Sequence, residues 1–268
     1  MEPSGADRPP RRGILEVRGE RLEWSAWGPA PEAAPTLVFL HEGLGCVSLW
    51  RDFPKRLAEA TGWGAFAYSR RGYGESDPCS LPRPLSYMHH EGEEILPAVL
   101  DAAGIRSYVH VGHSDGGSIA LIHAGSTERP GLRGLITEAA HVFNEEVCVE
   151  AIFSIRDQFE SGDLRRRLAR HHGSNTGCAF WGWCDAWLAP GFRDWNLEGY
   201  LPAIHKPWLV IQGADDDYGT LAQVDAIEAK AGGPCERFVP QGCRHAPHID
   251  QPDLMLERMA AFVSGLQA

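Results

Sequence analysis

The sequence lacks the features that mark membrane, secreted and nucleic-acid-binding proteins. No apolar run approaches the roughly 20 residues that a membrane-spanning helix needs. The opening residues, MEPSGADRPPRRG, hold charges and prolines but no apolar stretch of a secretory signal, so residues 1–12 are expected to form a flexible tail. Positive charge is scarce, with 25 Lys and Arg against 36 Asp and Glu, which argues against a nucleic-acid partner.

Cysteine also shows no recognisable pattern. The seven cysteines are odd in number and scattered, without Cys-x-x-Cys spacing. Together with the missing signal and membrane span, this favours a reducing, cytoplasmic location. Cys46 and Cys243 stand beside motifs described below, and a small buried residue is the favoured interpretation of each over a reactive thiol.

What the chain does have is the composition of an ordinary globular protein. Its 268 residues are 43% hydrophobic and 23% charged, enough for one large domain with its own core. The net charge of −11 is interpreted as a solubilising surface. The oligomeric state stays open, with a homodimer as one option.

Alternating patterns predict an α/β fold. Residues 13–28 alternate apolar and polar side chains around Gly19, as an antiparallel hairpin does. Apolar runs typical of strands buried on both faces follow in PTLVFL, GWGAFAY, SYVHV, LRGLI and KPWLVI, with ERFVP as a last strand. Helices are expected at residues 85–104, 115–124, 219–231 and 251–266. Such alternation indicates a mostly parallel sheet with helices on both faces.

Residues 141–205 interrupt this rhythm. The segment is rich in charge and aromatic rings and contains no good strand, while residues 145–159 and 161–172 have helical patterns. It is therefore a predicted helical insertion, which leaves residues 13–140 and 206–268 as the core.

A nucleophile is predicted in VHVGHSDGGSIAL, where Gly112, Ser114 and Gly116 form a G-x-S-x-G pattern. The pattern alone is common, but here a strand leads in and a helix leads out. A serine on such a sharp turn stands above the sheet, and the glycines remove side chains that would collide. The alternative is that Ser114 only caps the helix.

A base and an acid are available at other strand ends. His245 in QGCRHAPHID can reach inward as the general base, with His248 as a rival that more plausibly braces the loop. One of three adjacent aspartates in IQGADDDYG would orient the imidazole, and the others would cap the next helix. The pairs His245–His248 and His171–His172 also have metal-ligand spacing, but no third ligand follows and no metal is predicted.

The order serine, aspartate, histidine, with these motifs, resembles the α/β-hydrolase superfamily. VGHSDGG is similar to its nucleophile elbow, GADD to its acid loop, CRHAPH to its histidine loop, and YSRRGYGESDP to the loop after its fourth strand. The resemblance runs from residue 13 onward. It implies a catalytic triad of Ser114, Asp216 and His245, no cofactor, and residues 141–205 as a cap over the serine.

The resemblance also implies an oxyanion hole from the backbone N–H groups of Gly43 and Asp115, with the Asp115 side chain turned outward. In HEGLG, however, Glu42 replaces the expected first glycine. A carboxylate aimed at the oxyanion would oppose catalysis. The favoured interpretation is an ion pair with Arg70 or Arg71; the alternative is that Glu42 binds a polar or cationic substrate group or positions water.

The aromatic load of the cap must be buried, mostly in the cap's own core. A few rings should line the pocket, and the dense cluster RHHGSNTGCAFWGWCDAW is the first choice. The tentative substrate-binding residues are His41, Glu42, Trp181, Trp183 and Trp187.

The sequence thus predicts a serine hydrolase that cleaves a small or medium carboxylic ester or thioester. The alternatives are a carbon–carbon bond hydrolase of a ring-cleavage diketone, a hydrolase fold turned into a non-catalytic receptor, and a cofactor-free haloperoxidase. Dehalogenase and epoxide-hydrolase chemistry is disfavoured, because those relatives have Asp at the position of Ser114.

Overall fold

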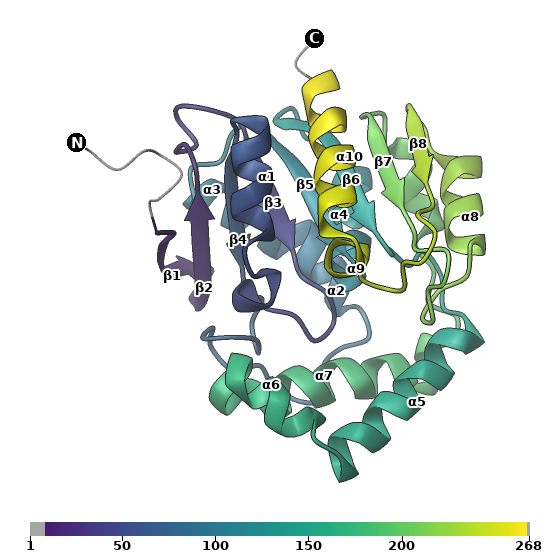
Figure 1. Ribbon diagram of the computed structural model, residues 1–268. Helices are drawn as coiled ribbons and strands as arrows, with labels where there is room; N and C mark the ends of the chain where they lie inside the picture. Colours follow the sequence, from purple (N-terminus) through teal and green to yellow (C-terminus); the bar gives the residue numbers. More distant parts are fainter. Residues whose placement is uncertain (1–8, 267–268) are drawn as a thin grey trace.

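An eight-stranded sheet forms the centre of the computed structural model, which describes residues 9–266 (Figure 1). The strand order is β1-β2-β4-β3-β5-β6-β7-β8. β1 pairs antiparallel with β2 and β2 with β4, and all other neighbours are parallel. The strands are β1 (Arg11–Val17), β2 (Glu20–Trp27), β3 (Thr36–Leu40), β4 (Gly64–Tyr68), β5 (Tyr108–His113), β6 (Leu132–Glu138), β7 (Trp208–Ile211) and β8 (Cys235–Phe238).

Helices cover both faces of the sheet and one of its ends. The α-helices are α1 (Phe53–Thr61), α2 (Tyr87–His90), α3 (Leu96–Ala102), α4 (Asp115–Ser126), α5 (Glu146–Ser161), α6 (Leu164–His172), α7 (Thr176–Leu188), α8 (Ala222–Lys230), α9 (Pro247–Asp250) and α10 (Pro252–Gly265). A π-helical turn, Glu91–Ile95, joins α2 to α3, and short 3-10 turns lie at Val47–Trp50, Gly173–Asn175, Pro190–Phe192 and Glu198–Ala203. Helices α1 and α10 pack together on one face, and α3, α4 and α8 bury their apolar side chains against the other.

The middle strands are mostly apolar because both of their faces are covered. Every residue of β3, β4, β5 and β7 is buried. The predicted α/β-hydrolase sheet with an N-terminal antiparallel hairpin is therefore confirmed. The hairpin begins earlier than predicted, because β1 starts at Arg11; residues 1–8 of the predicted tail lie outside the described part of the chain.

The helices of residues 141–205, which we call the cap segment, lie together beyond the carboxyl ends of the parallel strands (Figure 1). The predicted helices correspond to α5 and α6, while α7 was not predicted. Cys79, in the loop after β4, forms a disulfide with Cys178 in the first turn of α7. This link was not anticipated from the scattered cysteines, and it ties the cap segment to the core. Cys46 and Cys243 are free and buried, as predicted.

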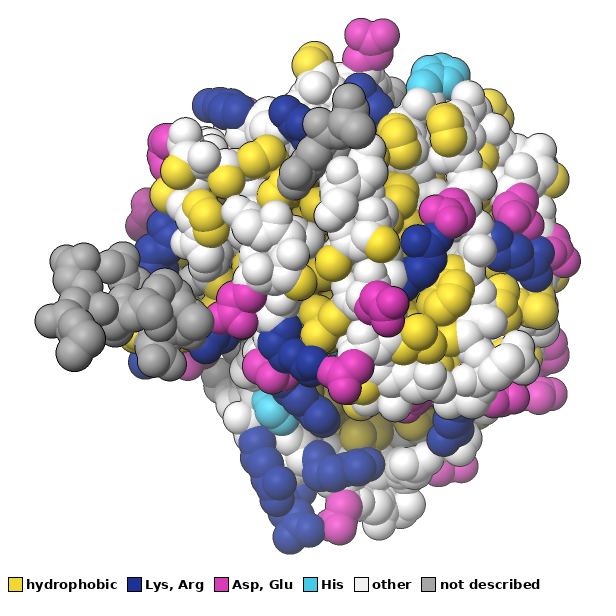
Figure 2. Space-filling model, turned by 45° about the horizontal axis from the view of Figure 1, so that its top comes forward, with side chains coloured by type: hydrophobic (Ala, Val, Ile, Leu, Met, Phe, Trp, Pro, Cys, Tyr) yellow, Lys and Arg dark blue, Asp and Glu magenta, His cyan; other side chains and the backbone are white. Residues whose placement is uncertain are grey.

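The surface mixes charges of both signs. On the face shown in Figure 2, acidic and basic side chains are interspersed with apolar ones, with a group of Lys and Arg toward one edge. Of the helices in residues 9–266, none combines the length and the apolar character that crossing a membrane requires.

Candidate active site

Ser114 sits on a strained turn between β5 and α4. Its backbone has φ 51° and ψ −119°, a conformation that non-glycine residues rarely adopt. The turn is tight because the two flanking glycines allow close packing. A Cβ on Gly112 would lie 2.5 Å from the carbonyl oxygen of Gly116, and one on Gly116 would lie 1.9 Å from that of Leu40. The N–H of Ser114 donates to the carbonyl of Glu138 at 2.8 Å, which fixes the turn to β6.

Ser114, His245 and Asp216 form a continuous hydrogen-bonded line. Ser114 Oγ lies 3.0 Å from His245 Nε2, and His245 Nδ1 lies 2.9 and 3.0 Å from the two carboxylate oxygens of Asp216. These distances let Nδ1–H donate to Asp216 while Nε2 accepts the serine proton, the arrangement that activates a serine for attack. The structure thus brings together the three residues that the sequence predicted as catalytic, at the carboxyl edge of the sheet.

The surroundings select Asp216 from the three adjacent aspartates. Its carboxylate accepts hydrogen bonds from Gln212 Nε2 at 2.6 Å and from the N–H of Tyr218 at 2.8 Å. Burial alone would raise the pKa of Asp216, but His245 and the N–H of Tyr218 lower it below its usual value. Asp217 instead pairs with Arg244 at the surface, and Asp215 is exposed, so neither caps α8 as predicted.

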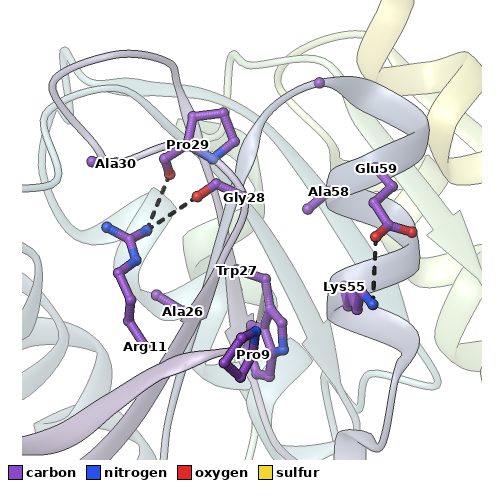
Figure 3. Close-up of a pocket in the computed structure, with 11 residues that line it drawn as sticks. Pro9, Arg11, Ala26, Trp27, Gly28, Pro29, Ala30, Lys55, Ala58 and Glu59 are labelled. Carbon is purple, nitrogen blue, oxygen red and sulfur yellow. Dashed lines mark hydrogen bonds and ion pairs between the residues drawn. The ribbon is translucent and has the colours of Figure 1, made fainter. Parts of the chain in front are cut away.

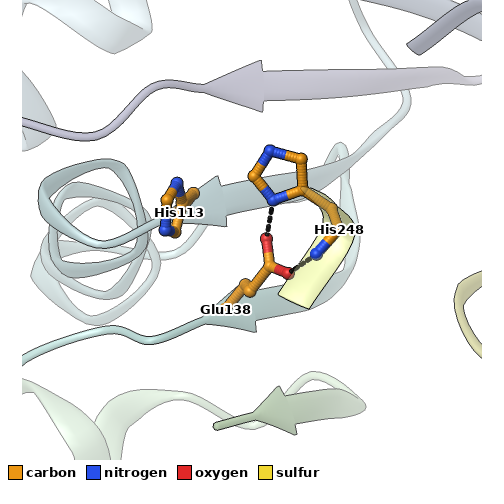
Figure 4. Close-up of side chains that lie close together, drawn as sticks. All are labelled: His113, Glu138 and His248. Atoms are coloured by element: carbon orange, nitrogen blue, oxygen red, sulfur yellow. Dashed lines mark hydrogen bonds and ion pairs between the residues drawn. The ribbon is translucent and has the colours of Figure 1, made fainter. Parts of the chain in front are cut away.

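A second histidine–carboxylate pair lies behind the first. Glu138, the last residue of β6, accepts hydrogen bonds at 2.6 Å from both the N–H and Nδ1 of His248 (Figure 4). His248 therefore braces its loop, as predicted. His113, Glu138 and His248 form a buried group, and the potential metal-ligating atoms of these three residues lie within 4.8 Å of one another. Because His248 engages both oxygens of Glu138, an ion pair accounts for this group without a metal.

The reactive groups open into a cavity of about 200 Å³ beneath the cap segment. Its lining contains Glu42, Gly43, Leu44, Ser114, Asp115, His141, Cys148, Trp183, Trp187, Tyr218 and His245. The N–H groups of Gly43 and Asp115 both belong to lining residues, and neither donates to a protein acceptor within the described residues. Two free N–H groups beside a serine suit an oxyanion, and that role remains a prediction.

The structure corrects the favoured interpretation of Glu42. Its carboxylate lies nearest to His113, with Oε2 3.7 Å from Nδ1. Arg70 donates instead to the backbone carbonyls of His41 and Glu42, at 2.5 and 3.0 Å, and Arg71 pairs with Glu20. The predicted ion pair with Arg70 or Arg71 is therefore wrong, because the Arg70 guanidinium is occupied by the backbone of the turn.

The side chain of Asp115 also differs from the expectation, since it turns inward and is fully buried. It accepts hydrogen bonds from Tyr87 Oη at 2.5 Å and Trp187 Nε1 at 3.2 Å, and it lies 4.0 Å from the Arg70 guanidinium. These contacts join the residue after the nucleophile to cap helix α7. The backbone N–H of Asp115 is still free, because the side chain points away from it.

Of the five tentative substrate-binding residues, Glu42, Trp183 and Trp187 line the cavity and two do not. Trp181 packs edge-on against Phe159 and Phe180, in the core of the cap segment. His41 is buried, and its ring donates to the carbonyl of Glu42 at 2.7 Å and accepts from the N–H of Arg70 at 3.1 Å. It therefore supports the turn, and neither His41 nor Trp181 lies in the cavity lining where the sequence predicted them.

The sequence analysis missed four lining residues: Leu44, His141, Cys148 and Tyr218. His141 was recognisable, because it follows β6 at the same edge as Ser114. Its Nε2 lies 3.1 Å from the carbonyl of Tyr218, and burial, with help from His245, lowers its pKa. Tyr218 lies over the catalytic imidazole, with ring centroids 4.6 Å apart. No local pattern singles out Leu44 or Cys148.

A larger hollow, of about 690 Å³, lies at the opposite end of the sheet, between the end of β2 and α1 (Figure 3). Its polar groups are occupied by one another. Arg11 donates to the carbonyls of Gly28 and Pro29, and Lys55 pairs with Glu59. It contains no nucleophile or base in a reactive arrangement, so the smaller cavity at Ser114 is the candidate site.

Comparison with solved structures shows the same fold in known enzymes. An esterase from Exiguobacterium antarcticum superimposes with a TM-score of 0.75 at 18% identity, covering 95% of this chain and all of that one. Naproxen esterase from Bacillus subtilis gives a TM-score of 0.72 at 16% identity, over 96% of this chain and 92% of that one. At these identities the likeness concerns the fold alone.

Comparison by sequence is more specific. A 2-succinyl-6-hydroxy-2,4-cyclohexadiene-1-carboxylate synthase from Serratia proteamaculans is 34% identical over 212 residues, which are 77% of this chain and 71% of that protein. A protein of the same name from Pectobacterium atrosepticum is 24% identical over 88% of this chain and 97% of its own length. Residues 35–193 match the family model described as alpha/beta hydrolase fold. The chain therefore belongs to the alpha/beta hydrolase fold family.

Proposed function

We propose that this chain is a serine hydrolase that cleaves a small or medium carboxylic ester or thioester through an acyl-enzyme on Ser114. The observation that carries the proposal is the hydrogen-bonded line from Ser114 Oγ through His245 to Asp216. A serine held by a base, with the base held by a buried carboxylate, is an arrangement that activates the hydroxyl at neutral pH.

In the first half-reaction, Ser114 Oγ attacks the substrate carbonyl while His245 Nε2 takes its proton. The negative charge that develops on the carbonyl oxygen is stabilised by the N–H groups of Gly43 and Asp115. Collapse of this intermediate breaks the bond to the alcohol or thiol, which leaves with the proton from His245. Asp216 stabilises the imidazolium throughout.

In the second half-reaction, water attacks the acyl-enzyme. His245 takes a proton from the water and returns it to Ser114 Oγ as the carboxylic acid leaves. No group beyond water is consumed, so ester and water are converted to acid and alcohol.

The test is turnover of p-nitrophenyl acetate and butyrate, and of a matched thioester, by purified protein and by Ser114→Ala. Loss of a triad serine lowers kcat by about 10⁶-fold in a well-studied serine protease, so the variant should be inactive within detection. A fluorophosphonate probe should label the wild-type protein at Ser114 only. Hydrolysis that persists in Ser114→Ala, or failure of both turnover and labelling, would refute the proposal.

The second candidate is the reaction class of the two sequence relatives. Their shared name describes synthesis of a product that bears a succinyl group and a ring carboxylate, and the Serratia protein is 34% identical to this chain. The cavity lining speaks against so anionic a compound, because it includes the Glu42 carboxylate but no Lys or Arg. Assaying formation of that product beside ester and vinylogous-diketone hydrolysis separates this candidate and the carbon–carbon hydrolase from the esterase. Tight binding with no turnover of any would indicate a receptor.

A further inference from the structure

The cavity at Ser114 has an acidic wall. Glu42 immediately precedes Gly43, whose N–H is one of the two proposed oxyanion donors, and its side chain is 29% exposed in an otherwise buried turn. Burial favours a higher pKa for Glu42, but the adjacent His113 lowers it far below its usual value, so the carboxylate is ionised at neutral pH. A negative charge therefore borders the space that a substrate would fill.

The protein leaves most of this carboxylate unused. Among residues 9–266, its ion-pair partner is His113, whose Nδ1 lies 3.7 Å from Oε2, longer than an ordinary hydrogen bond. An ionised carboxylate offers about four acceptor positions, of which His113 can use one. Glu42 differs in this from two other carboxylates of the chain, Asp216 and Glu138, which are held by donors at 2.8 and 2.6 Å.

The backbone makes room for this placement. A Cβ on Gly45 would lie 2.2 Å from Glu42 Oε2, so the carboxylate lies directly against the glycine Cα. With the turn tied to Arg70 through two backbone carbonyls, the Glu42 side chain has a defined position beside the cavity.

No cation lining the cavity offsets this charge. Its described lining holds no Lys or Arg, and the buried Arg70 lies behind it, against the turn and Asp115. Burial lowers the pKa of both His41 and His141, which keeps those two imidazoles neutral at pH 7. A substrate that presents a carboxylate here would meet like charge in a poorly solvated space, whereas an ammonium group would find a carboxylate with acceptor positions still available.

We propose that Glu42 is a specificity-determining residue, which binds an ammonium group or another strong hydrogen-bond donor carried by the substrate close to the scissile carbonyl. This inference rests on the proposed hydrolase function and narrows it to amino- or hydroxyl-bearing esters. Glu42 would act by binding alone, without exchanging protons in the chemical steps.

The experiment compares esters matched in size and different in charge. One series places an ammonium, a methyl or a carboxylate on the acyl group of p-nitrophenyl esters. The other places a dimethylammonium group, which keeps one N–H donor, or its uncharged isopropyl analogue on the alcohol of butyrate esters. A hydrogen bond to a charged group contributes about 1.5–3 kcal/mol, which converts to a preference of about 10- to 100-fold in kcat/KM for the cationic ester in at least one series.

Glu42→Gln keeps the shape and removes the charge. It should abolish that preference by lowering kcat/KM for the cationic ester more than for the uncharged one, and it should raise turnover of the anionic ester relative to the uncharged one. Glu42→Asp keeps the charge one methylene further back and should show an intermediate preference for the cationic ester. It also provides a second variant in case Glu42→Gln misfolds. Glu59→Gln on α1, whose carboxylate pairs with Lys55 far from the cavity, is the matched control.

Two outcomes would overturn the inference: a wild-type protein with no preference for the cation in either series, or a Glu42→Gln variant that loses activity equally on all esters. Failure of the hydrolase proposal is distinguishable, because then no ester is turned over. In that case, calorimetric binding of butylammonium, butanol and butyrate to the Ser114→Ala protein still tests whether Glu42 binds a cation. Tighter binding of butylammonium, lost in the double variant with Glu42→Gln, supports the role of Glu42; equal or no binding of butylammonium refutes it.

Discussion

His113 Nε2 lies 2.7 Å from the backbone carbonyl oxygen of His245, and this bond joins the residue before Ser114 to the proposed general base. Since the carbonyl can only accept, Nε2 must carry the proton. The two loops come from parts of the chain 132 residues apart. A single hydrogen bond thus helps to set the 3.0 Å separation between Ser114 and the catalytic imidazole.

Removal of this bond should lower the rate more than it weakens binding. In His113→Phe an aromatic ring remains, somewhat larger than the imidazole, but the donor is lost, and loss of such a supporting contact costs about 10- to 100-fold in activity. We expect kcat to fall while KM stays within about threefold of wild type, because positioning of the base affects the chemical step. Steady-state kinetics on a neutral ester measure both constants. His90→Gln, at an exposed position on α2, should match wild type; a His113→Phe protein with unchanged kcat would show that the bond is dispensable.

The orienting acid can be tested against its own neighbour. Asp216→Asn removes the charge that stabilises the imidazolium, and in a comparable triad this change lowers kcat by about 10⁴-fold. Asp217→Asn removes only a surface pair with Arg244 and should stay within about twofold of wild type. Ester hydrolysis by the two variants, measured side by side, provides the comparison. Equal activities would show that Asp216 is not the acid of the triad.

The buried pair of Glu138 and His248 should make stability depend on pH in a bell-shaped way. Burial favours a lower pKa for His248, but Glu138 raises that pKa above 6.5. The contribution of His248 to stability is therefore complete below pH 6.5 and is lost as pH rises through the raised pKa. Burial favours a higher pKa for Glu138, but His248 lowers that pKa below 4.5. The contribution of Glu138 to stability is therefore complete above pH 4.5 and is lost as pH falls through the lowered pKa. The pair therefore stabilises most between pH 4.5 and 6.5.

Urea midpoints measured from pH 4 to 9 test this window. The variant His248→Gln leaves a buried carboxylate without its cation, and breaking such a pair costs about 3–5 kcal/mol. Its stability loss relative to wild type should be greatest between pH 4.5 and 6.5 and should shrink as pH rises above the window. A difference from wild type that is constant across the whole range would mean that the pair is not ionised.

Local patterns were sufficient to predict the fold and the positions of Ser114 and His245, whereas the choice of Asp216 among three adjacent aspartates needed the resemblance to the α/β-hydrolase superfamily. Ser114, Asp216 and His245 each follow a recognisable strand, and parallel strands bring their carboxyl ends to one edge, so the sequence could place all three together. The partner of Glu42 could not be predicted in this way. His113 neighbours the nucleophile in the chain, but only the packing of α9 and β6 determines that its ring lies behind the turn.

Helix α7 shows a second limit of sequence patterns. Gly177 and Gly182 weaken the helical signal, and the helix forms because burial of its aromatic face compensates for that low propensity. Without the helix, Trp181, Trp183 and Trp187 looked equivalent. On a helix, residues four apart share a face, which brings Trp183 and Trp187 to the cavity, while Trp181 turns toward Phe159.

The contact between Gly45 and Glu42 provides a test that leaves the carboxylate itself unaltered. In Gly45→Ala the new methyl would stand 2.2 Å from Oε2, and the flexible Glu42 side chain is the group that can move away. Displacement should reduce the preference for cationic esters by about tenfold, since Glu42 keeps its charge but loses its position.

Gly45→Ala should not change the preference for cationic esters when it is combined with Glu42→Ala, because the new methyl then meets no carboxylate. Kinetics of the cationic and neutral esters in wild type, both single variants and the double variant form a cycle that isolates this coupling. Additive losses in the double variant would mean that Gly45 serves the turn itself, through the close approach of its backbone, and does not act through Glu42.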